Sequence, residues 1–317
     1  MGDRVRRAPR QRTEPGMDGM DGSYLSRLRV WQDAPHTVVQ DLPVPAASSV
    51  PAGPHNPSEF ADRLYAWEAL KPPAAGPAAL EAPEPYTLQW FLNIESQRHG
   101  RQGRWIPRLL EFSKHAGETL LGLGDGLGTD WLQYARHGAA VVVCSPWFDQ
   151  LALIRRNFEL RGLSGRFLHA APGALPLEAA SIDVACVSGL LHQVAAPQAV
   201  VEEVYRVLKP GGKVLAVTAA RFDVDFWYHA CLPWKAWIKG QQGAPASRSA
   251  RFTARSLRRL FGRFVDHRVH KRHLNRSEVP HLWRWLPRPV LERLMGRALI
   301  LKAFKPLSAA NLVQAAA

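Results

Sequence analysis

Four glycines form the feature of this sequence that points most directly to ligand binding. They are Gly122, Gly124, Gly126 and Gly128, at every second position of the stretch LLGLGDGLGTD. Glycine permits positive φ angles and has no Cβ, so a ligand can lie directly against the peptide plane. The sequence therefore predicts a loop that contacts its ligand mainly through backbone groups.

The spacing of these glycines disfavours two common nucleotide loops. The dinucleotide fingerprint G-x-G-x-x-G would require glycine at positions that hold Leu127, Thr129 and Trp131. The lysine of a P-loop is also missing from the stretch. Val143 further disfavours a nicotinamide-dependent oxidoreductase. In such enzymes an acid near the end of the second strand binds the ribose, and here that position holds valine.

Apolar runs that alternate with amphipathic stretches indicate how the loop is positioned. Helices are expected at Thr129–His137, Pro146–Arg161 and Ala196–Leu208. Short buried strands are expected at Glu118–Leu123, Ala139–Cys144, Gly165–Ala170, Ile182–Ser188 and Lys213–Thr218. This alternation predicts a doubly wound, Rossmann-like α/β fold, with a mostly parallel sheet and helices on both faces.

Further signals predict how the elements begin and how the sheet is completed. Ser145 and Pro146 are a typical N-cap and first-turn proline, and Thr253 can cap a helix near the C-terminus. The apolar face of that last helix would consist of Leu257, Leu260, Phe261 and Phe264. Strands near Val265–His270 and at Ala298–Phe304 would complete a seven-stranded sheet as a hairpin-like edge pair.

Composition divides the chain into four predicted regions. Residues 1–85 are rich in Pro, Ala, Gly and Ser and are expected to form a partly disordered extension, with one short helical candidate at Pro57–Leu70. Residues 86–220 would form the ligand-binding core. Residues 221–306 would supply a lid and the last strands of the sheet, and residues 307–317 a tail.

Three stretches, in this order and spacing, resemble the class I S-adenosylmethionine-dependent methyltransferases with a type 11 methyltransferase domain. They lie within roughly Trp105–Val217 and read GLGDGLGTDWLQYARHGAAVVVCSP, ALPLEAASIDVACVSGLLHQV and VVEEVYRVLKPGGKVLAV. The resemblance implies S-adenosyl-L-methionine as the cofactor, bound at the glycine loop, and methyl transfer as the activity.

The resemblance also implies three acids that hold the cofactor, and all three positions differ here. They map to Gly122, Val143 and Ala171, so other groups must replace them if binding is tight, because a hydrogen bond to a charged group contributes about 1.5–3 kcal/mol. Asp125, Asp130 and Asp149 lie within or close to the same loops, the Ser145 hydroxyl could serve the ribose, and Trp147 could flank the adenine. The predicted cofactor-binding residues are Gly122, Gly124, Asp125, Gly126, Leu127, Gly128, Ser145, Asp149, Ala171 and Ser188.

His192, in SGLLHQV, is the predicted catalytic residue. It follows the fourth strand, on the edge of the sheet that would face the transferred methyl group, and it could act as a general base. A structural hydrogen bond is the alternative role. Aromatic residues after the fifth strand favour a small-molecule or lipid-like acceptor, although they could instead cover the sheet edge or enter a membrane surface: Trp227, Tyr228, Trp234 and Trp237.

The net charge of +14 is concentrated near the C-terminus. Between Arg248 and Lys305, sixteen Lys and Arg stand against three acids. Such a segment could attract an acidic membrane surface, or it could be a solvated face without a partner. We expect no nucleic-acid partner, because no recognised module accompanies the aromatic and basic stretch HLWRWLPRPVLERL.

The remaining composition predicts a cytoplasmic protein without a metal site. Cys144, Cys186 and Cys231 are odd in number and far apart, which disfavours both a disulfide framework and a zinc site. No run of eighteen apolar residues and no signal-peptide pattern is present. Two functions stay open: a methyltransferase, or a degenerate methyltransferase-fold protein that has lost catalysis and acts as a binding or scaffold protein.

Overall fold

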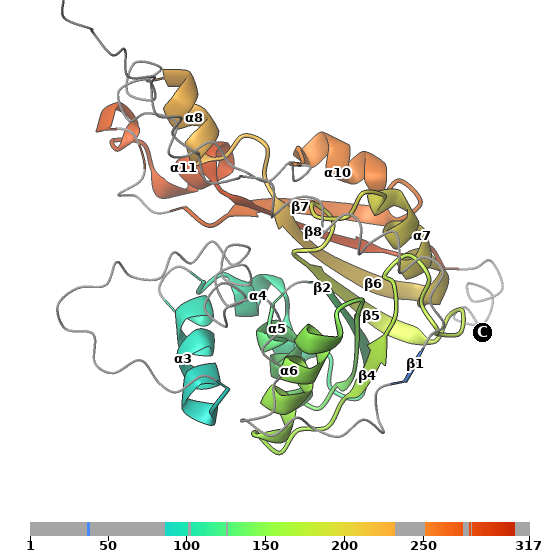
Figure 1. Ribbon diagram of the computed structural model, residues 1–317. Helices are drawn as coiled ribbons and strands as arrows, with labels where there is room; N and C mark the ends of the chain where they lie inside the picture. The colour runs from blue at the N-terminus through green and yellow to red at the C-terminus, as the bar shows by residue number, and fades with distance from the viewer. Residues whose placement is uncertain are drawn as a thin grey trace, which may run out of the picture. The chain divides into compact units, whose positions relative to one another are not determined.

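The computed structural model describes residues 37–38, 86–100, 103–124, 126–231, 251–274, 279 and 281–307 (Figure 1). All of them belong to the second of the two units into which the chain divides, His36–Ala317. The predicted helix at Pro57–Leu70 lies outside the described residues, as do Asp125, Trp234 and Trp237.

A sheet of eight strands, counted over the described residues, carries the fold, in the order β1-β4-β3-β2-β5-β6-β8-β7. Strands β4, β3, β2, β5 and β6 are parallel, β8 is antiparallel to both β6 and β7, and the short β1 pairs with β4. The seven longer strands confirm the predicted mostly parallel sheet. The bounds are β1 Thr37–Val38, β2 Thr119–Gly124, β3 Ala140–Ser145, β4 Arg166–His169, β5 Ile182–Ser188, β6 Leu208–Ala219, β7 Val265–Arg272 and β8 Ala298–Phe304.

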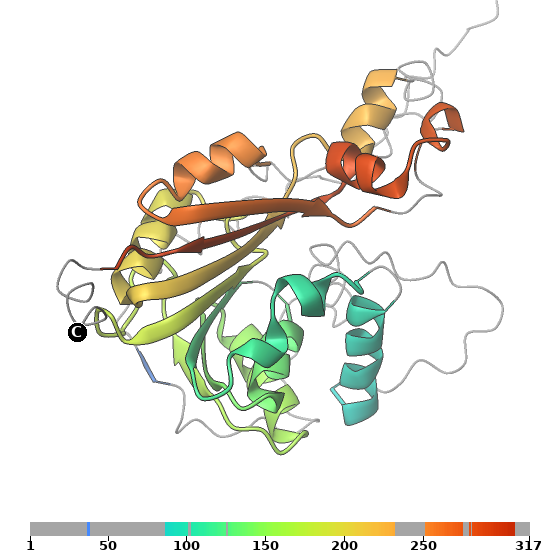
Figure 2. The ribbon, with the colours of Figure 1, turned by 180° about the vertical axis from the view of Figure 1, so that it is seen from behind.

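Helices cover both faces of the sheet, as Figures 1 and 2 show. One face packs against α7 (Pro197–Val207) and α10 (Ala254–Leu260), and the other against α4 (Ile106–Leu109), α5 (Thr129–Arg136) and α6 (Phe148–Glu159). Strand β2 shows the alternation that this requires. Leu121 and Leu123 belong to the first core cluster and Leu120 to the second, and all three side chains are fully buried.

The predicted strands and helices within the described residues are present with shifted ends. The largest shift is that of β6, which begins at Leu208 rather than at Lys213, and one helix start was predicted wrongly. Helix α6 begins at Phe148 with Trp147 at the N-cap, rather than at Pro146 with Ser145 as the cap. The reason is that Ser145 is still the last residue of β3, where it pairs with His169 of β4. Thr253 does cap α10, and it forms a reciprocal capping box with Ser256.

The last two strands adjoin in antiparallel pairing as predicted, but a long connection joins them. It includes the short turn η3 (His281–Trp283) and α11 (Arg288–Met295). Helix α11 packs with α8 (Val224–Cys231), which follows β6 at the carboxyl edge of the parallel strands. The buried members of this separate apolar cluster are Val224, Leu274, Val279, Leu291 and Met295.

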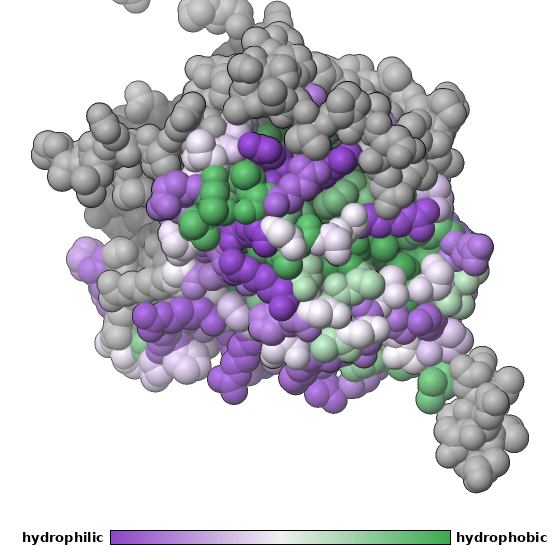
Figure 3. Space-filling model, turned by 90° about the horizontal axis from the view of Figure 1, so that it is seen from below, coloured by the Kyte–Doolittle hydropathy of each residue, from purple (hydrophilic) through white to green (hydrophobic). Residues whose placement is uncertain are grey.

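Over the described residues of the face in Figure 3, hydrophobic patches alternate with hydrophilic side chains. Over the described residues, no helix is both long and apolar enough to cross a membrane. Within the same residues, no cluster of His, Cys, Asp and Glu has the arrangement of a metal site.

Candidate cofactor site

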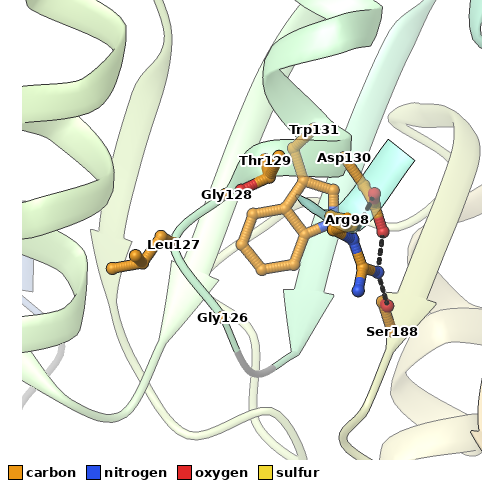
Figure 4. A pocket seen from close by; sticks show the side chains of 8 residues that line it. All are labelled: Arg98, Gly126, Leu127, Gly128, Thr129, Asp130, Trp131 and Ser188. Carbon is orange, nitrogen blue, oxygen red and sulfur yellow. Dashed lines mark hydrogen bonds and ion pairs between the residues drawn. The ribbon is translucent and has the colours of Figure 1, made fainter. Parts of the chain in front are cut away.

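A small pocket lies where β2 runs into α5 (Figure 4). Strand β2 is flanked by β3 on one side and β5 on the other, so the chain leaves it at the topological switch point where open α/β sheets bind ligands. The pocket also receives a side chain from α3 (Leu88–His99), which precedes β2 in the sequence. Its lining residues are Arg98, Gly126, Leu127, Gly128, Thr129, Asp130, Trp131 and Ser188.

The glycines of the loop are required first by the fold. Gly124 has a φ of 151°, and a Cβ there would lie 1.8 Å from the carbonyl oxygen of Ser188. Gly128 has a φ of 71°, and a Cβ there would lie 2.6 Å from a methyl carbon of Ile154 in α6. These two glycines therefore let the loop pack against β5 and α6, whatever ligand it binds.

Two buried amides of α6 hold the loop from one side. Gln150 Nε2 donates to the carbonyl of Gly126 at 2.8 Å and to that of Gly124 at 3.3 Å. Asn157 Nδ2 donates to the carbonyl of Leu127 at 3.1 Å. The Ser145 hydroxyl donates to Gln150 Oε1 at 2.7 Å and so orients that amide. The sequence analysis did not identify the two amides, whose spacing of seven residues along one helix face was the available signal.

An ion pair holds the loop from the side of α3. Arg98 Nε donates to Asp130 Oδ1 at 2.7 Å, a second guanidinium nitrogen contacts Asp130 Oδ2, and both side chains are buried. Arg98 also donates to the Ser188 hydroxyl at 3.4 Å, and His99 Nε2 lies 3.1 Å from Asp130 Oδ1. Burial by itself would raise the pKa of Asp130, but Arg98 beside it holds that pKa well below its ordinary value.

Trp131 explains why no acid stands at Gly122. A Cβ added at Gly122 would lie 2.7–2.9 Å from three atoms of the Trp131 indole ring, which is 2% exposed. The indole thus occupies the space that a side chain at the end of β2 would need. The carboxylate in this part of the site comes instead from Asp130, the second residue of α5.

The structure brings some of the predicted site residues together and separates others. Gly126, Leu127, Gly128 and Ser188 line the pocket, and Gly124 is the last residue of β2, at the start of the same loop. Ser145 is buried beneath it with its hydroxyl bonded to Gln150. The other predicted positions lie apart from the lining: Gly122 is under Trp131, Asp149 is exposed on α6, and Ala171 is half-buried after β4.

His192 lies after β5, outside the residues that line the pocket. It is buried, and its Nδ1 lies 3.5 Å from the Thr218 hydroxyl at the end of β6. Burial, and after it the positive charge of Arg251, lowers the pKa of His192 to about 4. The imidazole is therefore neutral near pH 7 and has a lone pair that can accept a proton.

Comparisons with known proteins agree with this geometry. Residues 120–216 match a family model described as a methyltransferase domain. The demethylmenaquinone methyltransferase of Thermus thermophilus is 32% identical over 121 residues, 37% of this chain and 55% of that protein. The demethylmenaquinone methyltransferase of Clavibacter sepedonicus is 36% identical over 104 residues, 32% of this chain and 40% of that protein. The chain thus spans about half the length of these relatives.

Solved structures of similar fold include an S-adenosylmethionine-dependent methyltransferase from Methanosarcina mazei. It is 18% identical, covers 64% of this chain and 98% of its own chain, and gives a TM-score of 0.46. Residues 120–216, which run from β2 into β6, are therefore similar to the methyltransferase domain family, and the sheet that they help to form has the mostly parallel, Rossmann-like strand order expected of that fold.

Proposed function

We propose that the protein binds S-adenosyl-L-methionine and transfers its methyl group to a small-molecule or lipid-like acceptor. The observation that carries this proposal is the pocket beside the glycine loop, which combines bare backbone with a buried cation, Arg98, and a buried anion, Asp130. A ligand with an ammonium and a carboxylate on one carbon, as in the amino-acid end of S-adenosylmethionine, complements both charges.

The ion pair can serve the ligand without being broken. A carboxylate has about four acceptor positions and a guanidinium five N–H donors, so each group keeps capacity beyond their mutual contacts. Asp130 would accept from the ligand ammonium, and Arg98 and the Ser188 hydroxyl would donate to its carboxylate. In this way Asp130 replaces the acid that Trp131 excludes from position 122.

The ribose and adenine would lie further along the carboxyl edge of the strands. Val143 is completely buried at the end of β3 and offers no polar group. Asp149 is exposed in the first turn of α6, so we assign it to the ribose hydroxyls. Trp147 and Ala171 would flank the adenine, while Ser145 acts indirectly, because its hydroxyl orients Gln150.

The chemistry requires little from the protein beyond positioning. The cofactor supplies a methyl group on a sulfonium, whose positive charge favours departure of the sulfur. The chain holds the reacting atoms in line and excludes water. His192, neutral and buried, would accept a proton from the acceptor, with Thr218 beside its Nδ1 to fix the ring.

The acceptor would enter from the side of α8 and α11, which we propose as the lid. Trp227 on α8 packs against Trp283, with the ring centroids 5.4 Å apart, and both belong to an apolar cluster at the carboxyl edge. Two relatives are named for demethylmenaquinone, which agrees with a lipid-like acceptor. We therefore place the acceptor class among apolar or aromatic small molecules.

A second candidate is a binding or scaffold protein that has kept the fold and lost catalysis. It is favoured by the way in which the polar groups already satisfy one another, since Arg98 bonds Asp130 and Ser145 bonds Gln150. The mapped acids at Val143 and Ala171 are also missing.

Calorimetric titration with S-adenosylmethionine separates the two candidates, with S-adenosylhomocysteine and NAD as comparators. We expect micromolar affinity for the first two and none for NAD. No binding of either sulfur compound would reject the methyltransferase proposal and leave the scaffold.

A pair of glycine variants tests whether the loop itself is the site. Gly126→Val places a branched side chain on the pocket-lining residue with a φ of 110° and should abolish cofactor binding. Gly162→Val is the matched control, because Gly162 also has a positive φ, 64°, but an added Cβ has nothing within 4 Å. Equal affinities of the two folded variants would overturn the assignment.

A further inference from the structure

The small cluster formed by α8, η3 and α11 carries an exposed apolar face. Phe222 and Phe226 are each 41% exposed, Val290 is 42% exposed and Leu294 is 39% exposed. Val290 and Leu294 are four residues apart on α11, which places them on the same side of that helix. The rings of Phe222 and Phe226 touch, with their centroids 4.9 Å apart.

Hydrogen bonds show that the two pairs adjoin. Lys271 Nζ donates both to the carbonyl of Phe222 and, at 2.6 Å, to that of Leu294. Trp227 Nε1, from α8, donates to the same Leu294 carbonyl at 3.2 Å. Figures 1 and 2 agree that α8 and α11 lie side by side. We call Phe222, Phe226, Val290 and Leu294 the α8–α11 face.

This face is not the outer side of an ordinary surface helix. Helix α11 already buries Leu291 and Met295 in its own cluster, yet it presents Val290 and Leu294 to the outside. A surface helix of a globular protein usually places polar residues there. Adjoining exposed apolar side chains with a charged rim are typical of interaction surfaces.

The charged side chains around the α8–α11 face indicate whether its partner is anionic or cationic. Among the described residues, three acids near the face are each paired with arginine: Asp223 with Arg251, Asp225 with Arg297, and Glu292 with Arg288. Arg293 is exposed beside Val290 and Leu294, and Arg221 lies over the Phe222 ring, 5.7 Å from its centroid. The rim is therefore positive, and it complements anions rather than cations.

We propose that the α8–α11 face docks on a lipid surface that carries anionic headgroups. The apolar side chains would enter the boundary between headgroups and acyl chains, and Arg221 and Arg293 would contact phosphates. Trp285, 78% exposed between η3 and α11, has the amphipathic character that favours this layer. The face lies at the carboxyl edge of the sheet, so a lipid-like acceptor would approach from the membrane side; that last step alone rests on the proposed function.

Sedimentation with lipid vesicles tests the proposal on the full chain. We expect binding to vesicles of phosphatidylcholine with phosphatidylglycerol, and much weaker binding to phosphatidylcholine alone. The affinity should fall steeply with salt. Leu294→Ser should weaken binding to the mixed vesicles about tenfold through lost apolar burial, and Arg293→Glu by a similar factor through charge reversal.

Matched control variants distinguish binding through the α8–α11 face from attraction of vesicles by the overall positive charge of the protein. Val265→Ser removes an apolar side chain that is 48% exposed on β7, and Arg258→Glu reverses an exposed charge on α10. Both should bind mixed vesicles like the parent protein. Circular dichroism and cofactor titration of all four variants should match the parent, since every altered side chain is exposed.

Three results would overturn the proposal. They are no binding to the mixed vesicles, equal losses in the control variants, or association of the protein with itself that Leu294→Ser abolishes while vesicle binding persists. Failure of the parent protein to bind S-adenosylmethionine would reject the proposed function but leave the vesicle result as it stands.

Discussion

The glycine loop is held from two sides by different chemistry. On the side of α6, Gln150 and Asn157 donate to three loop carbonyls and are neutral. On the side of α3, Arg98 and Asp130 form a buried ion pair that lines the pocket. The amide N–H groups donate to the loop backbone, whereas a guanidinium and a carboxylate have further donor and acceptor positions that could serve a ligand. We therefore propose that α6 fixes the shape of the loop and that α3 supplies ligand recognition.

Removing the charge on the α3 side should have the largest effect. Arg98→Met removes the guanidinium from the buried carboxylate of Asp130 and leaves His99 beside it, and losing one partner of a buried pair costs about 3–5 kcal/mol. Urea unfolding measures the loss, and cofactor titration should show binding abolished as well. Arg98→Met combined with Asp130→Leu should recover part of the stability and none of the binding.

A single variant that loses less than about 1 kcal/mol would contradict the ion-pair argument, because exposed pairs contribute at that level. A double variant that still binds the cofactor would contradict the assignment of recognition to α3.

Removing an amide on the α6 side should have a smaller and different effect. Gln150→Met keeps the length of the side chain but leaves the carbonyls of Gly124 and Gly126 without this donor, at a cost of about 1–3 kcal/mol. Urea unfolding would measure this loss, and cofactor affinity should fall only modestly. Gln198→Met, on the exposed face of α7, is the control and should be near neutral. Loss of binding without loss of stability would reverse the roles of the two sides.

The fold was predictable because local sequence patterns indicate most of its helices and strands. Buried strands such as Ala140–Ser145 consist mainly of apolar residues, and Thr253 is a typical helix-capping residue directly before α10. The chain order of strands and helices then leaves few topologies. The start of α6 was misplaced because Ser145 and Pro146 satisfy the rules for a helix start, while sheet pairing at Ser145 overrides them.

The candidate site was predictable only where it is local. The glycine loop and Ser188 follow from strand ends, but Arg98 stands 32 residues before Asp130, on a helix that the sequence analysis did not predict. The Trp131 indole likewise packs against the backbone of Gly122, and the spacing of residue types in the sequence does not predict such a contact. Residue types show that an acid is missing at Gly122, and only the structure shows what fills its place.

A pH titration gives the smallest of the expected effects and isolates His192 from both sides of the loop. Amides do not ionise, and Arg98 holds the pKa of Asp130 well below its ordinary 3.8, so neither the two amides nor the Arg98–Asp130 pair takes up a proton between pH 6.5 and 4. Burial, then Arg251, lowers the pKa of His192 from 6.5 to about 4. Below pH 6.5 His192 binds a proton in the unfolded chain but not in the folded chain, and this difference favours unfolding. The stability at stake is therefore fully present above pH 6.5 and is lost as the pH falls toward 4.

The unfolding free energy of the parent protein should therefore decrease between pH 7 and pH 5 by on the order of 1 kcal/mol more than that of His192→Gln. His115, His169 and His270 also have lowered pKa values, but they are present in both proteins and cancel in the comparison. Urea unfolding of the parent protein and of His192→Gln, each at pH 7 and at pH 5, gives the four unfolding free energies that the comparison requires. If both proteins lose the same stability, His192 is hydrated and titrates normally, and it would then be charged for much of the time near pH 6. That outcome would contradict the desolvated imidazole at His192, but it would not argue against a proton-accepting role, because a base whose pKa lies near the operating pH accepts a proton more readily than one whose pKa is about 4.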